Sequence, residues 1–275
     1  GNETDGKVNA KQYSKTVKRC EVIVGLANTR SEVYSIAREY VALTSIQKND
    51  ARLLGDEVGR KEVSERISFL LTSLNTEKEK MLIDANWHTE KRDYGKRNLK
   101  QINELASEIC DRRFFAAPTI KNELLNRKRP SSNARDAQNK LIRKLFQNPL
   151  EENLGIIGFP AERGLFESII VNSGLFLEGE GVQDPRGAET DPSNLGPLWK
   201  ATDDLLKKNT SRPVELKEIF ELWSKQPFGV NAGLHSLLAI LYFITSKSNV
   251  LLYLDKVFQT ELFEEDAELL SANPN

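Results

Sequence analysis

The feature that most constrains this sequence of 275 residues is the helical spacing of its apolar side chains. Between residues 63 and 82 they recur every three or four positions, which is the period of an α-helix with one buried face. The positions between them carry both signs of charge, as is typical of a helix that is exposed on one side or paired with another. The spacing predicts one long amphipathic helix around Val63, Ile67, Leu70, Leu71, Leu74, Met81 and Leu82.

Apolar residues at the same spacing predict two earlier helices, one around residues 17–24 and one around residues 33–43. Together with the long helix they resemble a helical hairpin or a short coiled coil. We therefore expect residues 1–95 to form a long-helix hairpin, whose simplest role is that of a packing scaffold.

Residues 96–176 predict a basic unit of three helices. An apolar stripe marks a helix over residues 99–109, Pro118 suits the first turn of a helix over residues 118–127, and Ser131 or Ser132 caps a third. A short apolar run between glycines follows the third helix, and then a further helix after Pro160. The order is compatible with a helix-turn-helix or winged-helix unit, although any three-helix bundle would show it.

Residues 177–194 are rich in glycine, proline and aspartate, and they predict a long loop or linker of low stability at a domain boundary. Beyond it, residues 195–275 predict three helices and then a β-hairpin, with strands at 249–254 and 257–262. That is the order of a winged helix. The predicted fold class is therefore mainly α, with winged-helix-like units and a small β-hairpin near the C-terminus.

The third of those helices, residues 232–246, has no Arg or Lys. A recognition helix of a helix-turn-helix protein needs polar and basic side chains that reach base edges. We therefore expect this helix to be buried in the core, and we expect the acidic C-terminal unit to contact protein rather than nucleic acid.

Charge is distributed unevenly along the chain, although 39 Lys and Arg nearly balance 40 Asp and Glu. Residues 91–144 hold 15 basic and 6 acidic residues, whereas residues 145–275 hold 10 basic and 20 acidic residues. The basic stretch either attracts a phosphate backbone or an acidic protein surface, or is a solvated face that pairs with the acidic third. The candidate nucleic-acid contacts are Arg127, Lys128, Arg129, Arg135, Asn139, Lys140, Arg143 and Lys144.

Patterns that carry catalytic chemistry are missing from the sequence. It has no phosphate-binding glycine loop followed by Lys and Ser or Thr, and no His-Glu-x-x-His pair. Its two histidines, His88 and His235, stand beside aromatic or apolar residues, which favours packing roles. We expect no catalytic residue, no metal site and no cofactor.

The longest apolar run, residues 237–244, is far shorter than the 18 to 20 residues or so of a membrane-spanning helix, so we expect no membrane partner. The two cysteines, Cys20 and Cys110, are too few for a disulfide framework, which favours a reducing, cytoplasmic location. The polar start without Met predicts a piece of a longer protein.

Five stretches of the sequence resemble a region of very large prokaryotic P-loop ATPases associated with phage defence, including those of BREX-type systems. The resemblance covers about residues 60–262, and the stretches follow one another in the same order as in those proteins. They are residues 109–111, 117–127, 131–135, 154–162 and 227–238.

The resemblance implies a helical and winged-helix portion of a larger ATPase, and it implies no catalytic residue here because the nucleotide-binding part has no counterpart in these residues. The partners would then be DNA or another nucleic acid, other defence-system subunits, or the ATPase domains of the same protein. The alternative is a protein interaction scaffold that docks subunits through its basic and acidic faces. An unrecognised hydrolase is a third hypothesis, which would need a cleft that holds His88 beside a carboxylate.

Overall fold

The computed structural model describes residues 12, 22–27, 31–89, 92–254, 257–259 and 264–267. The chain divides into two compact units, residues 1–112 and residues 113–275, which we describe separately. Both are mainly α-helical, and the sheets among the described residues are small and antiparallel, as the sequence predicted.

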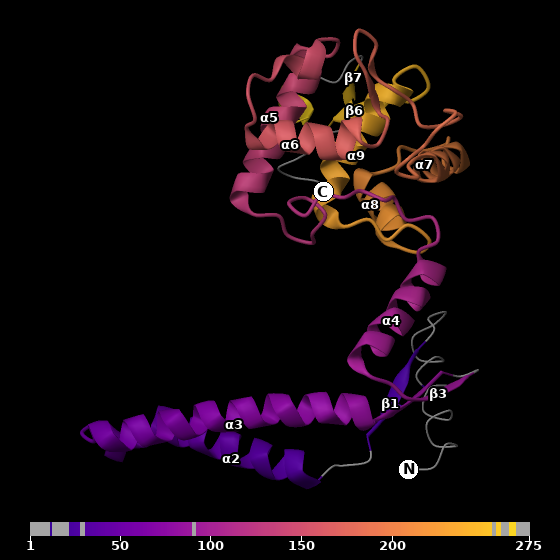
Figure 1. The fold of residues 1–275 in the computed structure, drawn as a ribbon. Coiled ribbons are helices and arrows are strands. Elements are labelled where there is room, and N and C mark those ends of the chain that lie inside the picture. The colour runs from indigo at the N-terminus through magenta and orange to yellow at the C-terminus, as the bar shows by residue number, and fades with distance from the viewer. Residues whose placement is uncertain are drawn as a thin grey trace. The chain divides into compact units, whose positions relative to one another are not determined.

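Two long helices form the body of the first unit. α2 (Ser31–Asn49) and α3 (Glu57–Asp84) lie side by side and are joined by the short 3₁₀ helix η1 (Ala51–Leu53) (Figure 1). Asp56 caps α3 by accepting a hydrogen bond of 2.9 Å from the amide of Gly59. The predicted long helix and helical hairpin are thus confirmed.

The seam between the two helices is narrow. Val63, Ile67 and Leu74 on α3 are half-buried, and only Leu70 of that helix is fully buried. Leu71 and Leu82, which the sequence placed in the same stripe, are 47% and 43% exposed. Two helices alone cannot enclose a wide apolar stripe, so the outer members of the stripe remain in contact with solvent.

A three-stranded sheet lies at one end of the hairpin, in the order β1 (Val24–Leu26), β2 (Asn86–His88), β3 (Asp93–Lys96). Val24 belongs to β1 and pairs with His88, so the helix predicted over residues 17–24 is wrong over residues 22–24. Residues 17–21 of that prediction lie outside the described residues. The predicted helix over residues 99–109 is confirmed as α4 (Leu99–Arg113).

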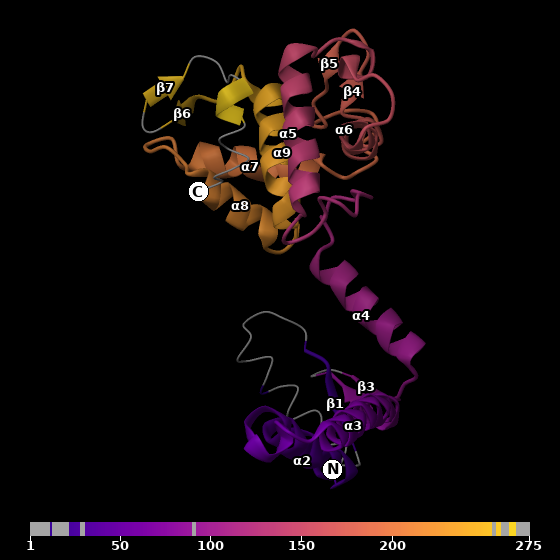
Figure 2. The ribbon, with the colours of Figure 1, turned by 90° about the vertical axis from the view of Figure 1, so that its left-hand side faces the viewer.

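The second unit is built on α5 (Ser132–Gln147) and α9 (Ala232–Ser246), which pack side by side (Figure 2). Of the two caps that the sequence predicted, Ser131 and Ser132, it is Ser131 that caps α5, and it accepts a hydrogen bond of 3.2 Å from the amide of Ala134. Most side chains of α9 are buried, which confirms it as a core helix.

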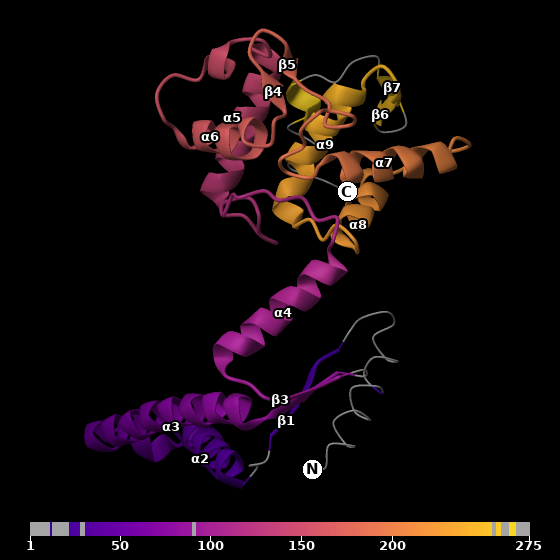
Figure 3. The same ribbon diagram turned by 45° about the vertical axis from the view of Figure 1, so that its right-hand side comes forward.

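The remaining helices and strands surround this pair. α7 (Gly196–Lys208), α8 (Leu216–Ser224) and α9 pack against one another, and the hairpin β6 (Leu252–Leu254) and β7 (Val257–Gln259) follows them (Figure 3). The predicted order of three helices and a hairpin is therefore present, with the turn residues 255–256 outside the described residues. On the other side of α5 lie η2 (Glu152–Gly155), α6 (Ala161–Leu165), the π-helical η3 (Phe166–Val171), and the strands β4 (Phe176–Leu177) and β5 (Gly181–Val182).

The helix predicted over residues 118–127 is wrong, because this segment consists of irregular backbone and turns. The side chain of Asn122 accepts hydrogen bonds from the amides of Leu124 and Leu125, at 3.0 and 2.9 Å. Such side-chain contacts compete with helical ones. The apolar run at residues 154–157 likewise forms no strand, and part of it belongs to η2 (Glu152–Gly155).

Residues 177–194, predicted as a linker between domains, do not separate two hydrophobic cores. Leu175 before the segment and Leu195 after it belong to one buried cluster. The segment is mostly irregular. Arg186 holds it against α7 (Gly196–Lys208) through an ion pair with Asp203 at 2.8 Å, and it forms a second ion pair, at 2.7 Å, with Asp184 of the segment itself. The division of the chain falls between residues 112 and 113 instead.

Candidate nucleic-acid interface

The basic character of the middle of the chain is concentrated in the second unit. Residues 113–144 hold nine basic and two acidic residues, which accounts for most of the excess in residues 91–144. The eight predicted contact residues divide between two consecutive elements. Arg127, Lys128 and Arg129 lie on a loop, which we call the basic loop (residues 126–130), and Arg135, Asn139, Lys140, Arg143 and Lys144 lie on α5.

The segment that leads into the basic loop is anchored to the core. Leu125 is completely buried, directly before the loop. The side-chain amide of Asn122 donates to Ser168 Oγ at 2.8 Å, and that of Asn126 donates to the carbonyl of Ile120 at 3.2 Å. The irregular backbone therefore has fixed hydrogen-bond partners, which is what holds a loop in one conformation.

The first turn of α9 holds the loop from the other side. The amide of Gly233 donates to the carbonyl of Arg127 at 2.9 Å. The side-chain amide of Asn231 donates to Asn126 Oδ1 at 2.8 Å and to the Asn126 carbonyl at 3.3 Å. Any side chain at Gly233 would collide with the carbonyls of Leu125 and Arg127, so this close approach requires glycine.

The cations of α5 are partly neutralised by acidic side chains of the same chain. Lys140 forms an ion pair with Asp136 one turn earlier, at 2.9 Å, and the hydrogen bond to Asp136 raises the pKa of Lys140. Arg143 lies 3.7 Å from Glu264, a carboxylate that also accepts a hydrogen bond from Gln147 at 3.0 Å. Part of the predicted basic face is therefore paired, as the hypothesis of a solvated face expected.

The cations of the basic loop are exposed and, among the described residues, unpaired, unlike Lys140 and Arg143 of α5. Arg127, Lys128 and Arg129 are exposed, and so is Arg135 at the start of α5. Within the described residues, no carboxylate lies within ion-pair distance of any of these four. They are therefore available to an incoming anion. Lys144, the last predicted cation on α5, is half-buried and likewise has no ion pair among the described residues.

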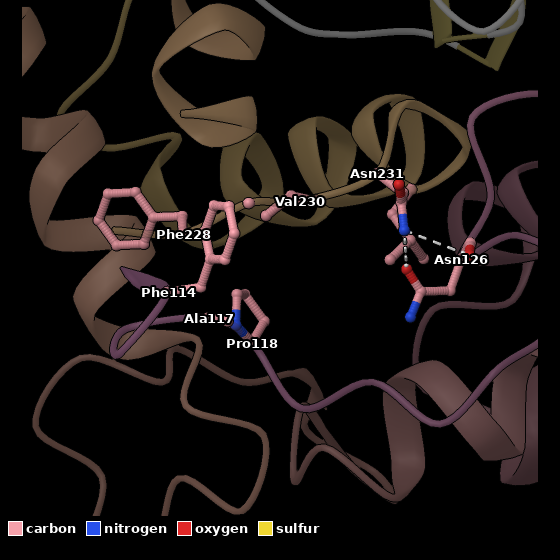
Figure 4. A pocket seen from close by; sticks show the side chains of 9 residues that line it. Phe114, Ala117, Pro118, Asn126, Phe228, Val230 and Asn231 are labelled. Carbon is pink, nitrogen blue, oxygen red and sulfur yellow. Dashed lines mark hydrogen bonds between the residues drawn. The ribbon is translucent and has the colours of Figure 1, made fainter. Parts of the chain in front are cut away.

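A pocket of about 240 Å³ adjoins the basic loop (Figure 4). Phe114, Phe228 and Pro118 gather at one end of it, and the hydrogen-bonded pair Asn126 and Asn231 lies at the other. The guanidinium of Arg113 lies 5.4 Å from the centre of the Phe114 ring. The remaining lining residues are Ala117, Gly229, Val230 and Leu234.

The two histidines have packing positions. His88 is 1% exposed, its Nδ1 lies 3.2 Å from Asp93, and it does not line the pocket beside the basic loop. His235 stacks on Phe220 with ring centres 4.8 Å apart, and burial lowers its pKa. Within the described residues no three His, Cys, Asp or Glu side chains gather closely enough to hold a metal ion.

The residues that fix the basic loop were missed by the sequence interpretation. Asn126 and Asn231 are 105 positions apart, and neither belongs to a known motif. A sharper signal was the sequence Asn231-Ala232-Gly233, because glycine in the first turn of an apolar helix indicates close contact with another backbone. Asn122 could have been recognised as a residue that favours turns over helix.

Comparisons with known proteins give no family for the chain: no family model matches it, and no curated protein or solved structure is significantly similar to it. Among the described residues, no helix combines the length and the apolar character that crossing a membrane requires.

Proposed function

We propose that the second unit binds the phosphate backbone of a nucleic acid through the basic loop, as a non-catalytic contacting or regulatory module. The observation that carries the proposal is the set of four exposed cations, Arg127, Lys128, Arg129 and Arg135, which have no ion-pair partner among the described residues. Lysine and arginine that neutralise phosphates release condensed counterions, and this supplies most of the affinity of sequence-independent binding.

The anchoring of the loop supports the same proposal. Backbone phosphates are bound most efficiently by cations on a fixed framework, because little further conformational entropy is lost on binding. Leu125, Asn126 and Gly233 supply that framework. The buried helix α9 has no exposed basic face for reading bases in the major groove, so we propose binding with little sequence specificity.

The attribution to a larger phage-defence ATPase depends only on the resemblance of residues 60–262. In that context the module would position DNA or RNA for a motor encoded in the same gene or operon. A P-loop sequence elsewhere in the same gene would support this attribution, and its absence from the gene and its neighbours would remove it.

The test is the salt dependence of binding to a short fluorescent DNA duplex, followed by anisotropy. We expect binding at about 50 mM salt that weakens steeply towards 200 mM. The triple variant Arg127→Ala, Lys128→Ala, Arg129→Ala should bind more weakly at every salt concentration. The slope of log affinity against log salt should flatten by about 0.9 for each phosphate that the variant no longer neutralises.

Lys140→Ala is the matched control, because it removes an exposed cation from the same basic stretch that is already paired with Asp136. It should change both the affinity and the slope much less than any single substitution in the basic loop. An undetectable interaction of the unmodified protein at about 50 mM salt would remove the proposed function.

A further inference from the structure

Residues 155–160 form a second loop of the second unit, which we call the apolar loop, and it presents two large apolar side chains to solvent. Ile157 is 93% exposed and Phe159 is 90% exposed, the highest values for any large apolar side chain that the structure describes. Scattered apolar residues on a surface are common. Two neighbouring ones that are almost fully exposed indicate a contact site.

The apolar loop is held in this exposed conformation. Leu154 is completely buried and Ile156 is 8% exposed, so these two residues anchor the loop while the alternate ones project outward. Leu154 has a φ of +53°, a left-handed conformation that costs a residue with a side chain about 1–2 kcal/mol. Asn148 helps to stabilise it by donating from its side-chain amide to the Leu154 carbonyl at 3.2 Å.

The charge beside the apolar loop restricts what it can bind. Glu151 and Glu152 are both exposed, and they precede the first residue of the loop by four and three positions. Carboxylates in this position disfavour an anionic lipid surface or a nucleic acid. They favour a partner that combines an apolar hollow with a basic rim.

The second unit itself carries such a hollow. Phe114, Pro118 and Phe228 are among the residues that line the pocket beside the basic loop. Arg113 directly precedes the lining residue Phe114 in the chain, with its guanidinium 5.4 Å from the centre of that ring, and Arg127 directly follows the lining residue Asn126. Its volume of about 240 Å³ exceeds the roughly 150 Å³ of an apolar cavity that accommodates benzene. A phenylalanine side chain therefore fits it by size, and its ring can pack against Phe114 and Phe228 at one end of the pocket.

We propose that the apolar loop of one copy of this chain inserts Phe159 into the pocket of a second copy. Ile157 then packs on the rim, and Glu151 and Glu152 approach Arg113 and Arg127 of the second copy. The two surfaces are different, so the contact is head-to-tail, and it leads to a closed ring or an open chain of copies. It does not depend on the proposed nucleic-acid function.

The first test is the molar mass in solution, measured by light scattering over a range of protein concentrations. The unmodified chain should exceed 31.1 kDa as concentration rises. The double variant Ile157→Ala, Phe159→Ala should associate at least about 30-fold more weakly, the effect of losing a buried aromatic anchor. Leu54→Ala is the matched control, because it removes a side chain that is 78% exposed in the first unit, and it should leave association unchanged.

Complementation between variants distinguishes this contact from every other mode of association. Ala117→Phe fills the pocket and leaves the apolar loop intact, whereas the double variant removes the apolar loop and leaves the pocket intact. Each alone should be monomeric. Because the contact is head-to-tail, an equimolar mixture should form a species of twice 31.1 kDa and nothing larger.

Circular dichroism spectra and melting curves show whether each variant is folded. If Ala117→Phe is not folded, Phe114→Ala replaces it, because it removes an aromatic side chain against which Phe159 would pack. A monomeric unmodified protein at high concentration would overturn the proposal. So would association that persists in the double variant, or a mixture that stays monomeric although both variants are folded.

Discussion

The basic loop and α5 follow one another in the chain and both carry lysine and arginine, yet they differ in how many of these cations have an ion-pair partner. On α5, Lys140 is paired with Asp136 and Arg143 lies near Glu264. On the loop, Arg127, Lys128 and Arg129 have no such partner among the described residues. A count of charges treats the two elements as one basic surface, whereas the structure pairs Lys140 and Arg143 of α5 and leaves the three loop cations and Arg135 of α5 without an ion pair among the described residues.

The difference follows from backbone geometry. A helix places residues four apart on the same face, so an acidic residue in the helix meets a lysine one turn later. A loop that is held to the core by its backbone points its side chains outward, where no helical neighbour lies beside them. Irregular structure therefore leaves the three loop cations available for a partner, whereas Arg135 on α5 is unpaired because no acidic residue stands three or four positions away from it.

The largest effect on binding is expected from reversing the charge of the loop with Arg127→Glu, Lys128→Glu and Arg129→Glu. Three attractive interactions become three repulsive ones, so duplex binding should weaken by more than about 100-fold. The side chains are exposed, so the melting temperature should stay close to that of the unmodified protein. Anisotropy measures the affinity, and a loss of less than about tenfold would show that the loop is not the main contact.

An intermediate effect is expected from Asn231→Ala, which removes two hydrogen bonds to Asn126 but no charge. The loop becomes less ordered, and affinity should fall by about fivefold, which corresponds to about 1 kcal/mol for the net loss of hydrogen bonding. The salt slope should not change, because the number of neutralised phosphates is the same.

The control for this prediction is Asn209→Ala, which removes a comparable side-chain bond to the carbonyl of Leu205 at the end of α7. It should leave affinity unchanged. An equal loss in both variants would mean that general destabilisation, not loop order, is responsible.

A smaller effect, in the opposite direction, is expected from Asp136→Ala. Lys140 loses its partner and becomes available, so affinity should rise by about two- to fivefold, the range for an exposed ion pair. The salt slope should steepen by up to about 0.9. Glu123→Ala removes an exposed carboxylate with no ion pair among the described residues, and it should raise affinity without the same change in slope.

The smallest effect concerns the pH dependence of the second unit. Burial lowers the pKa of His235 below its usual value of 6.5, so the unfolded chain binds this proton more readily than the folded one. Stability is then complete above about pH 6.5 and decreases as pH falls further, by at most about 1.4 kcal/mol per pH unit. Urea unfolding at several pH values measures it, and His235→Phe should remove this part of the dependence.

Much of the helical framework could be predicted from local sequence. The spacing around Leu70 predicted α3, the lack of Arg and Lys over residues 232–246 predicted the burial of α9, and the cap of α5 was narrowed to Ser131 or Ser132. Each of these signals depends on residues within one or two helical turns. The helix expected over residues 118–127 was predicted from Pro118 in its first turn, and it is wrong because the side chain of Asn122 accepts hydrogen bonds from the amides of Leu124 and Leu125, which favours turns.

Long-range pairing could not be predicted. Arg186 holds residues 177–194 against the core through Asp203 and Ser246, which are 17 and 60 positions away. The candidate site shows the same limit. The cations were found by composition, and the pairing of Lys140 with Asp136 follows from helical spacing, but the contact of Arg143 with Glu264 depends on the fold.

The central claim is that Lys128, which is unpaired among the described residues, contacts nucleic acid, whereas Lys140, which is paired with Asp136, does not. The most direct test is chemical acetylation of lysines with and without a DNA duplex at about 50 mM salt, measured by mass spectrometry. Both lysines are exposed and both carry a reactive amine. DNA should protect Lys128 strongly, and it should leave the acetylation of Lys140 almost unchanged. Equal protection of the two lysines, or stronger protection of Lys140, would contradict the account.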